Sequence, residues 1–82
     1  MLEVDYKKGF LKAISKIRNQ ADKIRIKKQI EKILEFPNTG KPMKYGRKGT
    51  REVYVSPYRL AYSYNLTENK IIFLDIYHKD EQ

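Results

Sequence analysis

The stretch REVYVSPYRLAYSYNLTENKIIFLDIYH, residues 51–78, decides the fold of this 82-residue chain. It contains three runs of β-branched and aromatic residues, at 51–55, 58–64 and 70–78. Such runs are typical of β-strands, and Ser56-Pro57 and residues 65–69 supply turn signals between them. Because short turns join antiparallel neighbours, the stretch predicts a three-stranded antiparallel meander.

The middle run alternates in a way that predicts two different strand faces. One parity holds Tyr58, Leu60, Tyr62 and Tyr64. If these pack inward, Arg59 points to the opposite face between the small residues Ala61 and Ser63. Two roles remain open for Arg59 there: an ion pair with Asp75 of the next strand, or the binding of an external anion.

The last run is apolar at both parities, which predicts a central strand with neighbours on both sides. Strict alternation assigns Ile72, Leu74 and Ile76 to one face and Ile71, Phe73, Asp75, Tyr77 and Lys79 to the other. His78, the only histidine, follows at the strand end. A lone histidine there is more often a bystander than a catalyst, and periodicity cannot decide between the two.

The first half of the chain predicts a strand and two helices. Residues 2–6 alternate apolar and acidic side chains, as in a short strand. Residues 7–18 form an amphipathic helix with an apolar face made by Phe10, Ala13, Ile14 and Ile17. Asn19 is a predicted N-cap for a second helix, which Pro37 ends. The order β-α-α-β-β-β predicts one α+β domain over residues 1–82, with a helix hairpin on one face of a mainly antiparallel sheet.

Charge and composition restrict the possible partners. Eighteen Lys and Arg residues against ten Asp and Glu give a net charge of +8. This favours a polyanionic partner or, equally, a solvated lysine-rich surface. The chain has no cysteine, so it forms no disulfide and no cysteine-based zinc site. Without a signal-peptide pattern or a long apolar run, we expect a cytoplasmic protein.

Four segments resemble the toxins of the RelE/ParE superfamily of type II toxin–antitoxin systems, most closely the RelE branch. They are GKPMK at 40–44, REVYV at 51–55, YRLAY at 58–62 and HKD at 78–80. The RelE branch implies a ribosome-dependent endoribonuclease that cuts mRNA and inhibits translation. The ParE branch implies an inhibitor of DNA gyrase without nuclease activity, and a degenerate member would only bind its antitoxin. In each case the implied partner is an acidic, RelB-like antitoxin.

The RelE resemblance also implies site residues. Arg59 matches the arginine that binds the scissile phosphate, and Lys79 matches a second basic residue after the last strand. His78 and Tyr54 are further catalytic candidates, while Glu52 and Tyr54 stand where RelE has two lysines. The implied reaction needs no metal or cofactor: the 2′-hydroxyl attacks the adjacent phosphate and leaves a 2′,3′-cyclic phosphate.

The segment PNTGKPMKYGRKGT, residues 37–50, predicts a basic loop, because Gly and Pro interrupt helices and strands. In the RelE interpretation this loop and the start of the next strand bind ribosomal RNA through phosphates, without reading sequence. The predicted RNA- and ribosome-binding residues are Lys41, Lys44, Arg47, Lys48 and Arg51.

Overall fold

The computed structural model describes residues 2–42 and 49–81. Its elements are β1 (Glu3–Tyr6), α1 (Lys8–Ser15), α2 (Gln20–Glu35), β2 (Lys41–Pro42), β3 (Thr50–Val55), β4 (Tyr58–Asn65), β5 (Lys70–His78) and a 3-10 turn, η1 (Lys79–Glu81). The predicted α+β class and element order are confirmed, with one correction. Residues 41–42, expected in a loop, form an edge strand that pairs antiparallel with β3. Proline is tolerated there because an edge strand has one side free of ladder bonds.

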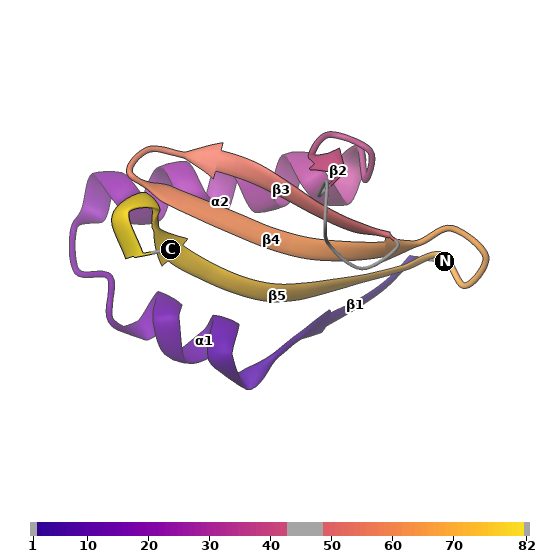
Figure 1. Cartoon of the computed structure of the whole chain (residues 1–82), viewed down its shortest axis with the longest axis horizontal. Coiled ribbons are helices and arrows are strands. Elements are labelled where there is room, and N and C mark those ends of the chain that lie inside the picture. Colours follow the sequence, from indigo (N-terminus) through magenta and orange to yellow (C-terminus); the bar gives the residue numbers. More distant parts are fainter. Residues whose placement is uncertain (1, 43–48, 82) are drawn as a thin grey trace.

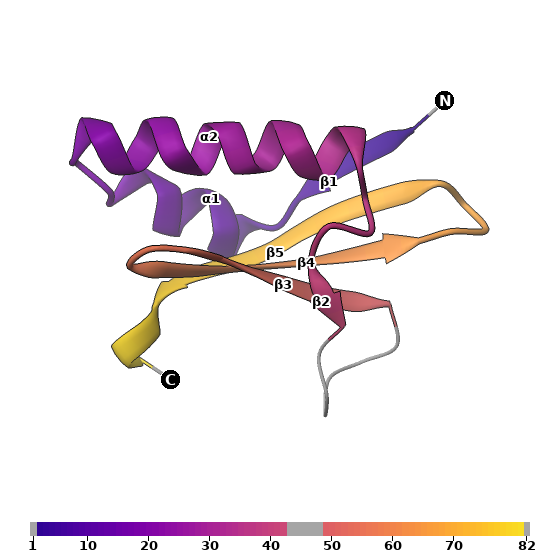
Figure 2. The same cartoon turned by 90° about the horizontal axis from the view of Figure 1, so that it is seen from above.

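The described strands form one sheet in the order β1-β5-β4-β3-β2 (Figure 1). β1 runs parallel to β5, and the other neighbours are antiparallel. β5 is therefore flanked on both sides, as its two apolar faces predicted. Both helices lie on one face of the sheet, and no α-helix of residues 2–42 and 49–81 lies on the opposite face (Figure 2).

The helix hairpin supplies half of the core. Phe10 and Ile17 from the first helical segment and Ile26 and Ile33 from α2 are buried against the sheet. α1 ends earlier than predicted because the N–H groups of Lys16 and Ile17 bond three residues back, which tightens the last turn. The Asn19 side chain accepts a hydrogen bond from the backbone N–H of Asp22 at 3.1 Å, confirming the predicted cap. No helix of the described residues is long and apolar enough to cross a membrane.

A β-bulge in β5 changes which residues reach each face. Across the ladder Ala61 pairs with Asp75 and Tyr62 pairs with Phe73, so Leu74 is the extra residue. The strictly alternating prediction for this strand is consequently wrong beyond Phe73. Phe73 and Ile76 both point into the core. The residues at 75 and 77 are thereby moved to the face without helices.

Tyr62 connects the core to the segment that leads into β2. Its side chain is fully buried. The hydroxyl accepts a hydrogen bond from the Gly40 N–H at 2.8 Å and donates one to the Pro37 carbonyl at 2.7 Å. Burial raises the pKa of Tyr62, so the phenol stays protonated and can keep donating. A side chain at Gly40 would collide with the Tyr62 ring, since an added Cβ would lie 2.9 Å from it.

Replacing Tyr62 with phenylalanine is expected to destabilise the fold by about 1–3 kcal/mol, because it leaves the buried Gly40 N–H without its partner. Urea unfolding, compared at equal m-values, measures this loss. Tyr64→Phe is the matched control, since the Tyr64 hydroxyl has no hydrogen bond within the described residues. Equal losses in the two variants would contradict the bracing role of Tyr62.

Candidate functional site

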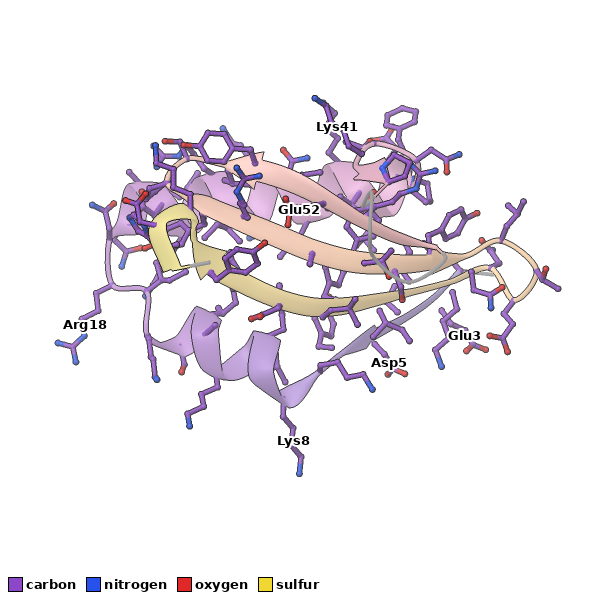
Figure 3. All side chains as sticks on the ribbon, viewed as in Figure 1. Glu3, Asp5, Lys8, Arg18, Lys41 and Glu52 are labelled. Atoms are coloured by element: carbon purple, nitrogen blue, oxygen red, sulfur yellow. The ribbon has the colours of Figure 1, made fainter. Side chains whose placement is uncertain are left out.

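A group of polar side chains lies on the sheet face that has no helix. Arg59 of β4 pairs with Tyr54 of β3 on one side and with Tyr77 of β5 on the other. Glu52 of β3 shares the face of Tyr54, because it lies two residues away along the strand. Figure 3 shows Glu52 over the middle of the sheet. We call Glu52, Tyr54, Arg59, Tyr77 and Lys79 the open-face cluster.

Glu52 is the centre of this cluster. Its Oε1 lies 3.0 Å from Arg59 Nη1, and its Oε2 accepts a hydrogen bond from the Tyr77 hydroxyl at 2.6 Å. The carboxylate of this β3 residue thus accepts hydrogen bonds from side chains of both β4 and β5. The residue that pairs with Glu52 in the ladder is the small Ala61, which leaves space for the carboxylate above the sheet.

The ion pair between Arg59 and Asp75, one of the two roles left open for the arginine, does not form, because Arg59 pairs with Glu52 instead. The bulge aligns Asp75 with Ala61, one ladder position away from Arg59. The Asp75 carboxylate accepts a hydrogen bond from the backbone N–H of Ile76 at 2.8 Å. A cross-strand pair does exist at Arg59, but it involves the preceding strand.

The guanidinium of Arg59 retains unused donors. Its Nε is buried and has no hydrogen-bond partner within the described residues. The carbon Cζ lies 5.8 Å from the centroid of the Tyr54 ring, a cation–π distance. The Arg59 side chain is 38 % exposed, so its outer edge reaches solvent. A guanidinium has five N–H donors. Arg59 can therefore bind a second anion together with Glu52, or bind one after Glu52 has been displaced.

The two tyrosines beside Arg59 have pKa values displaced in opposite directions. Burial, followed by the hydrogen bond and the charge of Glu52, raises the pKa of Tyr77 to about 12. The hydrogen bond with Ser56 lowers the pKa of Tyr54, and the cations of Lys79 and Arg59 add to this effect. One phenol is therefore held as a donor while its neighbour loses its proton more readily.

Lys79 completes the cluster. Its backbone N–H donates to the Pro57 carbonyl at 2.9 Å, which anchors the start of η1 beside the β3–β4 turn. η1 turns toward the side of the sheet away from the helices (Figure 2). Its ammonium is close enough to Tyr54 to lower the pKa of that phenol. The structure thus brings three of the predicted catalytic residues together, Tyr54, Arg59 and Lys79.

His78 lies apart from these three residues. Adjacent residues of a strand point to opposite faces, so His78 faces the helices while Tyr77 faces away from them. Its ring meets Tyr58 edge-on, with the centroids 5.9 Å apart. Its Nδ1 accepts a hydrogen bond from the Asp80 N–H at 3.3 Å. The catalytic role of His78 stays a prediction, and it would have to act around the end of β5.

The predicted RNA-binding residues have different surroundings. Lys41 is exposed on β2 and points outward (Figure 3). Arg51 is engaged internally, because its Nη1 donates to the carbonyls of Gly40 at 2.6 Å and Asn38 at 3.4 Å. RNA binding by these residues stays a prediction. The other three lie outside the described residues: Lys44, Arg47 and Lys48.

Glu52 is the functional candidate that the sequence analysis missed. The resemblance marks it only as a replacement for a lysine. The tight turn at Ser56-Pro57 sets Tyr54 opposite Arg59, and from that register Glu52 lies diagonally across from the arginine. The feature of the sequence that could have revealed Glu52 is therefore its negative charge, within cross-strand reach of Arg59.

A family model described as the ParE toxin of type II toxin–antitoxin system, parDE, matches residues 4–82. The chain belongs to this ParE toxin family. The predicted superfamily is thereby confirmed, and the protein is a toxin of a type II toxin–antitoxin system. No curated protein matches the toxin's sequence significantly.

Several solved structures share the toxin's fold. One chain of the intact RelBE toxin–antitoxin complex of E. coli matches with a TM-score of 0.80 and 21% identity, covering 100% of the present chain and 100% of the matched chain. The isolated E. coli RelE toxin matches with a TM-score of 0.80 and 19% identity, covering 100% of the toxin and 88% of RelE. The RelE–RelB complex of Pyrococcus horikoshii OT3 matches with a TM-score of 0.75 and 18% identity. This match covers 99% of the present chain and 98% of the matched chain. At these identities the likeness shows a common fold.

Proposed function

We propose that the toxin is a ribosome-dependent endoribonuclease that cuts mRNA at its open-face cluster. The observation that carries this proposal is the gathering of two cations, Arg59 and Lys79, with two tyrosines of displaced pKa on one side of the sheet. Phosphoryl transfer without a metal requires such charge stabilisation together with a base and an acid.

In the proposed reaction Arg59 and Lys79 bind the oxygens of the scissile phosphate. Tyr54, whose lowered pKa favours the phenolate, takes the proton from the 2′-hydroxyl in that form as the 2′-oxygen bonds to phosphorus. The bond from phosphorus to the 5′-oxygen breaks, and Tyr77 gives its proton to that oxygen. The products are a 2′,3′-cyclic phosphate and a free 5′-hydroxyl. Proton exchange with water then returns Tyr54 to the phenolate and Tyr77 to the phenol, so neither metal nor cofactor takes part.

We also propose an acidic, RelB-like antitoxin as the partner that controls the toxin in the cytoplasm. The net charge of +8 favours an acidic protein. Several structures that share the fold are toxin–antitoxin complexes, including those of E. coli and P. horikoshii. In this proposal the toxin contacts the ribosome and mRNA only when the antitoxin is absent.

A second candidate is a gyrase inhibitor that cleaves nothing. It is favoured by the ion pair between Arg59 and Glu52, which already satisfies part of the guanidinium. Arg59 would then stabilise the sheet or contact gyrase. A degenerate toxin that only binds its antitoxin is the limiting case, in which neither target is affected.

Primer extension on mRNA from cells that express the toxin separates these functions when combined with a gyrase supercoiling assay. We expect cuts within codons of translated mRNA and unchanged supercoiling. Purified toxin should cut the same message only when ribosomes are present. Lost supercoiling without cuts would select the gyrase inhibitor, and no effect in either assay would select the degenerate toxin.

A further inference from the structure

A groove of about 410 Å³ lies between α1 and the end of β5, on the helix side of the sheet. α1 contributes Lys12 and Lys16 to its lining, and the strands contribute Tyr58 and His78. A Cβ added at Gly9, also in the lining, would meet no atom within 4 Å, so the groove is open at this point. Of the residues that line the groove, the proposed cleavage mechanism uses only Tyr77.

The groove is strongly cationic. None of the residues that line it is acidic, and no ion pair within the described residues involves Lys12 or Lys16. The carboxylate of Asp80 lies outside the lining, with its Oδ2 3.7 Å from His78 Nδ1. His78 adds a donor, because its Nδ1 accepts from the Asp80 N–H and its Nε2 therefore carries the proton of the neutral ring. Two ammonium groups and an imidazole N–H around one hollow suit a ligand with several anionic oxygens.

The groove also meets the open-face cluster around the edge of β5. β1 pairs with β5 only as far as Phe73. After Phe73, the edge of β5 that faces away from β4 has no neighbouring strand among the described residues. Tyr77 lines the groove, yet its hydroxyl bonds to Glu52 on the opposite side of the sheet. A flexible polyanion that passes around this edge can therefore place one of its charges in the groove and the next one at the open-face cluster.

We propose that this groove is a second phosphate site, in which Lys12, Lys16 and His78 bind a backbone phosphate of a single-stranded nucleic acid. The inference deepens the proposed function and rests on it in one respect: the strand is the one whose scissile phosphate lies at Arg59. A nucleic acid fits better than an acidic protein because its charges repeat regularly along a flexible chain. Contacts of this kind hold the strand without reading its sequence.

The first test measures the affinity for a short 2′-O-methylated RNA, which cannot be cleaved, as a function of salt. For single strands the slope of log K against log salt falls by about 0.7 for each phosphate that the protein no longer binds. We expect Lys12→Gln/Lys16→Gln to lower the slope by about 0.7, the value for one lost phosphate contact. The matched control is Lys8→Gln/Lys27→Gln, which removes the same charge from exposed helix positions outside the groove. Lys8 points away from the fold (Figure 3), and we expect this control to keep the wild-type slope.

The second test locates the bound strand. His78 is the only histidine, so its ring gives one unambiguous ¹H–¹³C signal by NMR. Added RNA should shift this signal in the wild type and in Arg59→Ala, but not in the groove variant. Shifts that persist in the groove variant, or equal slopes in the groove and control variants, would overturn the proposal. Unchanged RNA affinity with lost antitoxin binding would overturn it in favour of an acidic protein.

Neither measurement requires cleavage or ribosomes, so the second phosphate site can fail while the nuclease stands. The reverse also holds: a bound RNA in the groove of a toxin that cuts no mRNA would sink only the proposed activity.

Discussion

Arg59→Lys is expected to lose about 100-fold or more of the mRNA cleavage although it keeps the positive charge, because one preorganised donor to a developing anion contributes about that much. A lysine cannot reproduce the planar fork that binds two phosphate oxygens. Primer extension on ribosomes programmed with a defined message measures the loss. Stability should fall by only about 1 kcal/mol, because the Arg59 side chain is partly exposed and such ion pairs contribute little.

Asp75→Asn is the control for this prediction. Asp75 lies on the same face as Arg59 but does not pair with it, and its carboxylate bonds to the backbone of Ile76. We expect this variant to keep most of the activity. If Arg59→Ala and Glu52→Gln each unfold the protein, Arg59 is a structural residue and the phosphate assignment is wrong.

Glu52→Gln is expected to raise the affinity of the open face for 2′-O-methylated RNA by about tenfold. The carboxylate of Glu52 now occupies Arg59 and Tyr77, which are the groups that the proposed phosphate needs. A charged hydrogen bond contributes about 1.5–3 kcal/mol, so replacing the carboxylate with an amide releases much of that competition. Asp75→Asn again serves as the matched control, since it removes one negative charge from the same face. Equal gains in the two variants would mean that only net charge matters.

The same variant is expected to change the titration of Tyr77. Burial raises the pKa of this phenol first, and Glu52 raises it further to about 12. The raised value stabilises the fold below pH ~10, where an unfolded tyrosine is still protonated, and this stabilisation is lost as the pH rises through about 12. In Glu52→Gln the loss should still begin near pH ~10, but it should be complete at a lower pH and be smaller in total, because the folded-state pKa falls. The ¹³Cζ signal of Tyr77, assigned with Tyr77→Phe, reports the change directly, and an unmoved midpoint would show that Glu52 does not control this phenol.

The order of elements and the core were predictable because they depend on local periodicity. Phe10, Ile26 and Leu60 each belong to a series of apolar residues spaced with the period of a helix or a strand. Burial of that apolar face is the main favourable free energy that such a segment gains on folding. The cap at Asn19 and the turn at Ser56-Pro57 are equally local, since their hydrogen bonds and dihedral preferences join residues a few positions apart.

The composition of the site depended on features that periodicity does not carry. A single extra residue, Leu74, reverses the facing of everything after it in β5. Strict alternation grouped Tyr77 on one face with Phe73, whereas the bulge places it on the opposite face, against Glu52.

The sequence by itself determined that Arg59 stands on the outer face of a sheet, because the alternation of β4 leaves its side chain no other direction. Only the tertiary structure decided what Arg59 holds and which residues join it. Register across β3, β4 and β5 sets Glu52 rather than Asp75 beside the guanidinium, and it turns His78 away to the helix side. The physical reason is that an ion pair or a hydrogen bond depends on distances of about 3 Å between atoms far apart in the chain, and those distances exist only once the strands have paired.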